Sequence, residues 1–95
     1  MPTLKNDNTK LVVGGIDAQT HQVMKNLVDV LNAAGSSLEK VIFARVYLVN
    51  FGDFDKMNSV YASYFAEDKL PARTCIGVTG LAVGASVEID FIAAC

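Results

Sequence analysis

The sequence has few of the residues that build disulfide scaffolds, metal centres and membrane spans. It contains two cysteines and one histidine in 95 residues. Because the cysteines are far apart and one is the last residue, no disulfide scaffold is expected, and a reducing compartment fits best. The histidine and the cysteines also lack the spacing of metal ligands. No apolar run approaches the roughly 20 residues that cross a bilayer, so no membrane partner is expected.

Positive charge is also scarce. Eight lysines and arginines stand against ten acidic residues, which gives a net charge of -2, and no basic run occurs. A nucleic-acid partner is therefore not expected. The first residues show neither the apolar core of a signal peptide nor an Arg-rich presequence, which predicts a cytoplasmic location. A mitochondrial location remains open if a presequence has been removed.

Hydrophobic residues are abundant, at 52% of the chain. The length predicts one domain over residues 1–95, and a domain of this size buries only a modest fraction of its surface. Apolar surface that stays exposed usually marks an interface, so the composition predicts a homo-oligomer. The alternative is a dense monomeric core.

The hydrophobic periodicity predicts six elements. Strands are expected at residues 11–13, 41–49, 72–78 and 87–93, and helices at residues 18–34 and 53–66. Asp17 is expected to cap the first helix. The apolar stripe of that helix contains Met24, Leu27, Leu31 and Ala34, widened by Val23, Val28 and Val30.

The order of these elements, β-α-β-α-β-β, predicts an α+β fold. Two amphipathic helices need a sheet face to cover, so we expect a two-layer α/β sandwich with a mixed sheet and both helices on one face. The last strand alternates in a way that leaves apolar residues on both faces of that sheet. The uncovered face is a second reason to expect self-association.

A candidate site lies in residues 71–76. Arg73 is one of two arginines and sits in a segment that reads as a buried strand. A guanidinium cannot lose its charge, so it needs an anionic partner. Cys75 shares its strand face, and Glu88 on the next strand can close the same pocket. Together they suit a small carboxylated molecule.

Structural explanations remain open for each of these residues. Arg73 can form an internal ion pair with Glu88 or Asp90, and Cys75 can be a small buried hydrophobe. Asn58 can line the cleft, but an exposed helix face is the preferred interpretation, and no catalytic role is assigned to it.

Several segments resemble the RidA family, also called YjgF/YER057c/UK114. The resemblance covers nearly the whole chain and rests on Pro71-Ala72-Arg73-x-Cys75 with Leu81 and Val87-Glu88-Ile89, on Asp53-Phe54 with Met57-Asn58-Ser59-Val60-Tyr61 and Tyr64-Phe65, and on residues 35–41. It implies the chorismate-mutase-like RidA fold and a trimer with clefts between subunits. Family members usually begin with an extra β-hairpin that carries a tyrosine near the ligand. Pro2 aligns just after that hairpin, so the fold is expected without its first two strands.

The resemblance also implies an activity that needs no metal and no cofactor. It is the hydrolysis of reactive 2-iminoacids or their enamines, such as 2-iminobutanoate and 2-iminopropanoate, to 2-ketoacids and ammonia. Arg73 would bind the carboxylate, Cys75 would form a pocket wall, and Glu88 would handle water and proton transfer. Two alternatives are a non-catalytic carboxylate-binding or regulatory module and a chaperone-like or translation-inhibiting relative.

Overall fold

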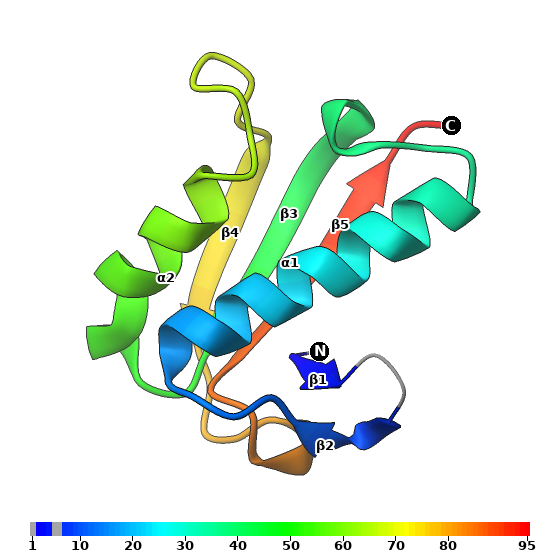
Figure 1. Ribbon diagram of the computed structural model, residues 1–95. Coiled ribbons are helices and arrows are strands. Elements are labelled where there is room, and N and C mark those ends of the chain that lie inside the picture. Colours follow the sequence, from blue (N-terminus) through cyan, green and yellow to red (C-terminus); the bar gives the residue numbers. More distant parts are fainter. Residues whose placement is uncertain (1, 5–6) are drawn as a thin grey trace.

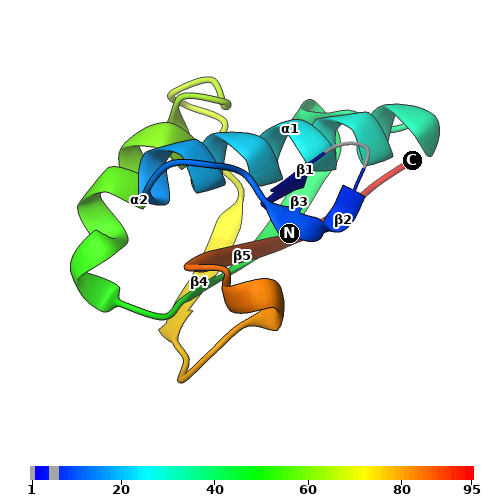
Figure 2. The same ribbon diagram turned by 60° about the horizontal axis from the view of Figure 1, so that its bottom comes forward.

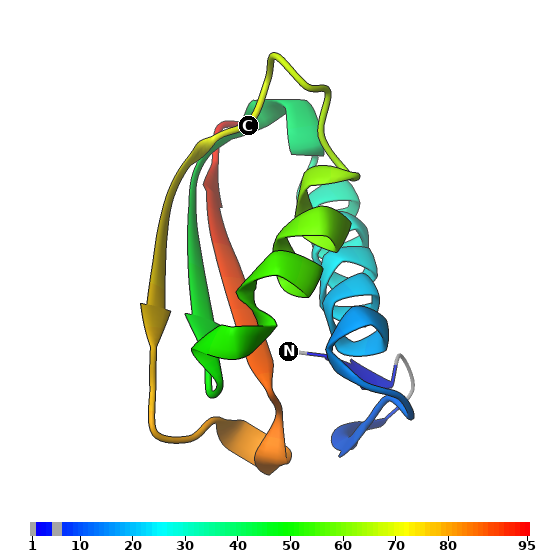
Figure 3. The ribbon, with the colours of Figure 1, turned by 90° about the vertical axis from the view of Figure 1, so that its left-hand side faces the viewer.

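Two helices lie on one face of a three-stranded sheet, as Figure 1 and Figure 3 show. The computed structural model describes residues 2–4 and 7–95, with the backbone alone for residues 7–10. The α+β two-layer sandwich predicted from the sequence is confirmed. In chain order the elements are β1 (Thr3–Leu4), β2 (Asp7–Leu11), α1 (Ile16–Ala33), the 3₁₀ turn η1 (Leu38–Lys40), β3 (Val41–Leu48), η2 (Phe51–Asp53), α2 (Phe54–Ala62), β4 (Ala72–Gly77), η3 (Ala82–Gly84) and β5 (Val87–Ala93).

The sheet has the strand order β4-β3-β5. The central strand β3 is parallel to β4 and antiparallel to β5, so the sheet is mixed as expected. The parallel pair requires a crossover connection, and α2 supplies it between β3 and β4. In the register, Ala44 of β3 lies beside both Arg73 of β4 and Phe91 of β5. Residues that are directly paired point to the same face of a sheet, so this register decides which side chains meet.

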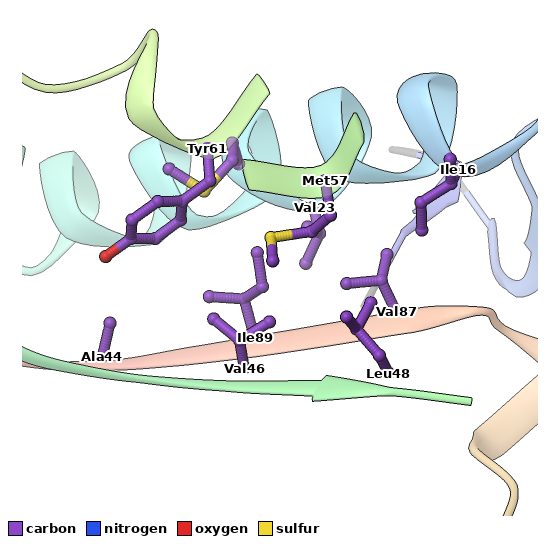
Figure 4. Close-up of a cluster of buried hydrophobic side chains, with 10 residues drawn as sticks. Ile16, Val23, Ala44, Val46, Leu48, Met57, Tyr61, Val87 and Ile89 are labelled. Carbon is purple, nitrogen blue, oxygen red and sulfur yellow. The ribbon is translucent and has the colours of Figure 1, made fainter. Parts of the chain in front are cut away.

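A single hydrophobic core fills the space between the helices and the sheet (Figure 4). Burying a large apolar side chain contributes about 1.5–3 kcal/mol, so these contacts fix both helices on the sheet. In particular, Met57 and Tyr61 attach α2 above the sheet. The buried members of the core are Ile16, Val23, Met24, Ala44, Val46, Leu48, Met57, Tyr61, Val87 and Ile89.

The predicted apolar stripe of the first helix is largely correct. Met24 and Leu31 are buried, whereas Val30 is 64% exposed. Val30 is turned by about 100° from its neighbour Leu31, which places it on the solvent side. Neither helix of the described chain has the length and apolar character that crossing a bilayer requires.

The N-terminal part of the chain differs from the expected single strand at residues 11–13. The structure has instead a short antiparallel hairpin, β1–β2, in which Thr3 pairs with Leu11 (Figure 2). The order is therefore β-β-α-β-α-β-β, and Val13 lies outside any strand and is 94% exposed. The reason is that Gly14, with φ of 126°, turns the chain toward α1 directly after the hairpin.

Both helices also have different ends from those expected. α1 begins at Ile16 with Gly15 as its N-cap, and no side chain caps it. Asp17 therefore lies inside the first turn, where its charge favours the helix dipole, and the expected capping role is wrong. The second helix ends at Ala62 instead of residue 66, because turns follow it directly.

The sheet face opposite the helices carries exposed apolar side chains. Ile92, Ile76 and Ile42 are 49%, 45% and 61% exposed. Figure 3 shows that no helix of the described chain covers this face. Apolar residues on both faces of the sheet, as the alternation of the last strand predicted, are therefore confirmed.

Candidate functional site

Strand β4 carries Arg73 and Cys75 on the face that looks toward the helices. Arg73 pairs with Ala44 and Cys75 with Val46, and both partners point into the core. The prediction that Arg73 and Cys75 share a face is therefore confirmed. Strand β4 is at the edge of the sheet, and Figure 1 shows α2 beside it.

The guanidinium of Arg73 is held by three side chains of α2. Arg73 Nη1 donates a hydrogen bond to Asn58 Oδ1 over 2.6 Å. Its Cζ lies 4.9 Å from the ring centroid of Tyr61 and 5.5 Å from that of Phe54. Positions 54, 58 and 61 repeat at intervals of four and three residues, which places them on one side of a helix. The cation is thus held by an amide oxygen and two aromatic faces.

No carboxylate of the described residues forms an ion pair with Arg73. Asp90, one of the two acidic partners considered from the sequence, accepts a hydrogen bond from Arg45 Nε over 2.8 Å. That pair lies on the opposite face of the sheet, because Arg45 and Asp90 alternate with the core residues of their strands. Arg73 therefore does not form the internal ion pair considered from the sequence. Because a guanidinium stays charged, its positive charge can still bind an anion.

A cavity of about 330 Å³ opens beside this guanidinium. Its volume is at the lower end of the range of small-molecule sites. Its lining combines one cation and one amide with an aromatic ring and aliphatic groups, which suits a small carboxylic acid. The lining residues are Asn58, Tyr61, Ala62, Leu70, Pro71 and Arg73.

Glu88 lies away from this cavity within one protomer. It pairs with Tyr47, so it points to the bare face of the sheet, and β3 separates its strand from that of Arg73. Its Oε1 accepts a hydrogen bond from the backbone N–H of Ile89 over 3.1 Å. The expectation that Glu88 closes the pocket of its own chain is therefore corrected. The two side chains occupy opposite faces of non-adjacent strands.

Cys75 packs against the hydrophobic core and is not among the residues that line the cavity. Burial raises the pKa of its thiol above the usual value, and the nearby charge of Arg73 offsets this effect only in part. A thiol with a raised pKa stays protonated near neutral pH, and the thiolate is the nucleophilic form. The chemistry therefore agrees with the expectation that Cys75 is not a nucleophile.

A larger cavity, of about 610 Å³, lies elsewhere on the molecule. It is formed by α1, η1 and the segment after α2, and it shares no lining residue with the cavity at Arg73. Its charged residues, Glu39 and Lys69, are exposed and of opposite sign. We place the candidate site at the smaller cavity because its partly buried cation, Arg73, has no acidic partner among the residues that the structure describes. Among the described residues, no group of three or more potential metal ligands occurs at either place.

The sequence did not reveal the α2 side of the site. Asn58 was expected on an exposed helix face, and it is instead half-buried against Arg73. Tyr61 belongs to the hydrophobic core, and its contact with the guanidinium was not foreseen. The available signal was the spacing of Phe54, Asn58 and Tyr61, which places two aromatic rings and an amide on one side of the helix.

Three comparisons place the chain among known proteins. The sequence model of the family described as Endoribonuclease L-PSP matches residues 2–95. The RutC family protein PH0854 from Pyrococcus horikoshii is 48% identical over 84 residues, which cover 88% of this chain and 66% of that protein. The chain thus spans about two thirds of the length of this relative.

Solved structures agree with these sequence matches. The crystal structure of the yeast protein YEO7 has a TM-score of 0.91 and 39% identity, covering 98% of this chain and 72% of that one. The structure of Escherichia coli TdcF with bound serine has a TM-score of 0.80 and 27% identity, covering 86% of this chain and 66% of that one.

Proposed function

The chain belongs to the endoribonuclease L-PSP family, which includes the RutC and RidA proteins, and from this membership we propose that it is a 2-iminoacid deaminase. Its substrates would be reactive 2-imino or enamine acids, such as 2-iminobutanoate and 2-iminopropanoate. Its products would be the corresponding 2-ketoacids and ammonia. The observation that carries the proposal is the guanidinium of Arg73, which faces a small cavity and has no carboxylate partner in the described part of the chain.

Arg73 is the proposed receptor for the substrate carboxylate. The planar fork of an arginine binds a carboxylate through two parallel hydrogen bonds, which fixes orientation as well as charge. A 2-iminoacid carries its carboxylate next to the reactive C=N carbon, so this contact would hold that carbon at a defined distance from β4. The serine bound to the related TdcF structure is also a small molecule with a carboxylate, which supports this ligand class.

The proposed reaction adds one water molecule to the imine and releases ammonia. The water oxygen bonds to the imine carbon, the C=N double bond becomes a single bond, and the nitrogen gains a proton. The carbinolamine then loses ammonia as its hydroxyl proton leaves and the C=O bond forms. A positioned carboxyl group that carries these protons typically contributes ~10²–10⁴-fold to the rate.

Glu88 is our candidate for this proton transfer, and it would have to come from a neighbouring protomer. Within one chain Glu88 and Arg73 lie on opposite faces of the sheet. A homotrimer in which the bare sheet faces pack together would form clefts between subunits, where both groups can meet. The exposed Ile76 and Ile92 on that face support this arrangement.

A second candidate function is carboxylate binding without turnover. The separation of Glu88 from Arg73 within a protomer favours it, because a single chain holds the receptor without the proton-transfer group. We do not propose RNA cleavage, although the family description includes the word endoribonuclease. The chain has a net charge of -2 and no basic run to neutralise phosphates.

The test is an imine-trapping assay. A threonine dehydratase and threonine generate 2-iminobutanoate, and semicarbazide traps whatever imine remains. The protein should accelerate the loss of trappable imine, and Arg73→Ala should lower kcat/KM by on the order of 10²–10³-fold.

Lys56→Ala serves as the control, because it removes the same charge from an exposed position of α2. If the wild-type protein does not exceed the rate in buffer, the deaminase proposal is wrong. Binding of 2-ketobutyrate without turnover would then support the binding module instead.

A further inference from the structure

The partner that holds Arg73 in place is uncharged. Asn58 Oδ1 accepts the hydrogen bond from Arg73 Nη1, and the distance of 2.6 Å is short for a bond of this type. An amide oxygen has a dipole but no net charge. An aspartate of nearly the same shape at this position would form an ion pair with the guanidinium.

Most of the hydrogen-bonding capacity of Arg73 remains unused. A guanidinium carries five N–H donors. Among the described residues, Asn58 is the hydrogen-bond acceptor found for this guanidinium. Tyr61 and Phe54 contact it through their ring faces, which attract a cation without accepting its hydrogens in a defined direction.

These contacts define the orientation of the guanidinium. One hydrogen bond at Nη1 slows rotation of the group, and the ring of Tyr61, itself 2% exposed, is fixed by the core. The Arg73 side chain is only partly buried, and it lines the cavity of about 330 Å³. A bidentate contact with a carboxylate needs such an orientation, because two parallel hydrogen bonds form only with a correctly turned fork.

We propose that Asn58 is a positioning residue that orients the Arg73 guanidinium without neutralising it. The inference rests on the proposed role of Arg73 in carboxylate binding. It adds Asn58 as a residue that acts on binding through Arg73. A neutral partner keeps the full positive charge for the ligand, whereas an acidic partner would compete with the ligand for the same donors. Asn58 therefore sets ligand affinity through Arg73.

The first test replaces Asn58 by aspartate. Asn58→Asp keeps the size of the side chain and adds one negative charge beside the guanidinium. We expect binding of 2-ketobutyrate, measured by calorimetry, to weaken on the order of 10- to 100-fold, as Coulomb's law gives for a unit charge near the ligand. In the imine-trapping assay KM should rise by a similar factor with kcat little changed, and the melting temperature should stay equal or rise.

The matched control is Asn32→Asp. Asn32 is exposed on α1, so the substitution gives the same net charge far from the site. The control should bind 2-ketobutyrate like the wild-type protein. If Asn58→Asp also binds like the wild-type protein, the neutral partner does not matter, and the inference is wrong.

A second measurement decides the positioning role without any ligand. Nitrogen NMR reports the rotation of the Arg73 guanidinium about its Cζ–Nε bond. This rotation should be several-fold faster in Asn58→Ala than in Asn32→Ala, and amide spectra show that both variants are folded. Equal rotation in the two variants would overturn the inference. If the wild-type protein binds no carboxylate, the proposed function fails, and the NMR result alone decides the role of Asn58.

Discussion

The two arginines of the chain are in opposite electrostatic situations. Arg45 forms an ion pair with Asp90, and the hydrogen bond that Arg45 donates to Asp90 raises the pKa of Arg45 above its usual value. Arg73 instead contacts an amide and two aromatic rings. A ligand carboxylate would therefore meet an uncompensated cation at Arg73 and a compensated one at Arg45.

The sequence predicted the importance of Arg73 but not its partners. An arginine within an apolar strand needs an anion whatever the fold, so this residue could be singled out without a structure. Its contact with Asn58 depends on how α2 docks on the sheet, which local sequence does not determine. For the same reason, the position of Glu88 required the strand order β4-β3-β5.

The two cysteines should differ in reactivity. Because burial raises the pKa of Cys75, only a small fraction of its thiol is ionised at pH 8, whereas Cys95 is exposed. Iodoacetamide should therefore modify Cys95 first, and the rate at Cys75 should keep rising as the pH increases past 9. Peptide mapping by mass spectrometry measures both rates. Faster alkylation of Cys75 than of Cys95 at pH 8 would show that its thiol is activated.

Removing the Tyr61 hydroxyl should stabilise the protein. This hydroxyl is buried and has no hydrogen-bond partner among the described residues, and burial raises its pKa, so it stays protonated. An unsatisfied buried polar group costs about 1–3 kcal/mol, so Tyr61→Phe should raise the free energy of unfolding by about 1 kcal/mol.

Urea denaturation measures the effect of Tyr61→Phe, and the substitution keeps the ring that contacts Arg73. A decrease in stability would indicate that the hydroxyl bonds to a water molecule or to a neighbouring protomer.

At the scale of elements, long patterned segments could be predicted and short ones could not. The apolar run at residues 41–49 predicted a strand, and β3 occupies Val41–Leu48. The hairpin β1–β2 was missed because its sequence is polar and has no clear alternation. Its strands pair with each other instead of joining the main sheet.

The start of α1 offers a test with two adjacent glycines. Gly15 is the N-cap with φ of -85°, which any residue adopts, and an added Cβ would meet nothing within 4 Å. Gly15→Ser should therefore raise the free energy of unfolding by a few tenths to about 1 kcal/mol, because serine caps the helix and reduces the entropy of the unfolded chain.

Gly14→Ala should have the opposite effect. Gly14 has φ of 126°, and a Cβ there would lie 2.7 Å from the Cβ of Ala18. The substitution should cost more than about 1 kcal/mol, because both the backbone and the contact are strained. Thermal or urea unfolding of the two variants compares them directly. Equal stability of Gly14→Ala and the wild-type protein would show that the turn before α1 is not fixed as described.

At the scale of the whole molecule, the bare sheet face is the main feature without an intramolecular explanation. It combines the exposed side chains of Ile42, Ile76 and Ile92 with the ion pair of Arg45 and Asp90. Apolar patches of this kind mark protein interfaces, and the proposed trimer would bury them. The hydrophobic composition predicted self-association, and the alternation of the last strand predicted that the uncovered sheet face would carry it.

Disrupting this face should separate the protomers and also remove the activity. Ile92→Glu places a charge on the bare face, whereas Val30→Glu places the same charge on α1, at a residue that is 64% exposed. Native mass spectrometry should give a trimer for the wild-type protein and Val30→Glu and a monomer for Ile92→Glu. Imine hydrolysis should be lost with the trimer, because Glu88 would no longer reach Arg73 of the neighbour. A fully active monomer would exclude a site shared between protomers.

The most direct test of the central claim is a calorimetric titration of the protein and of Arg73→Met with 2-ketobutyrate. Methionine keeps much of the apolar stem of the arginine and removes the cation. We predict that the wild-type protein binds the ketoacid, more weakly as salt increases, and that Arg73→Met shows no binding at millimolar concentration. Equal binding by both proteins would contradict the claim that Arg73 is the carboxylate receptor.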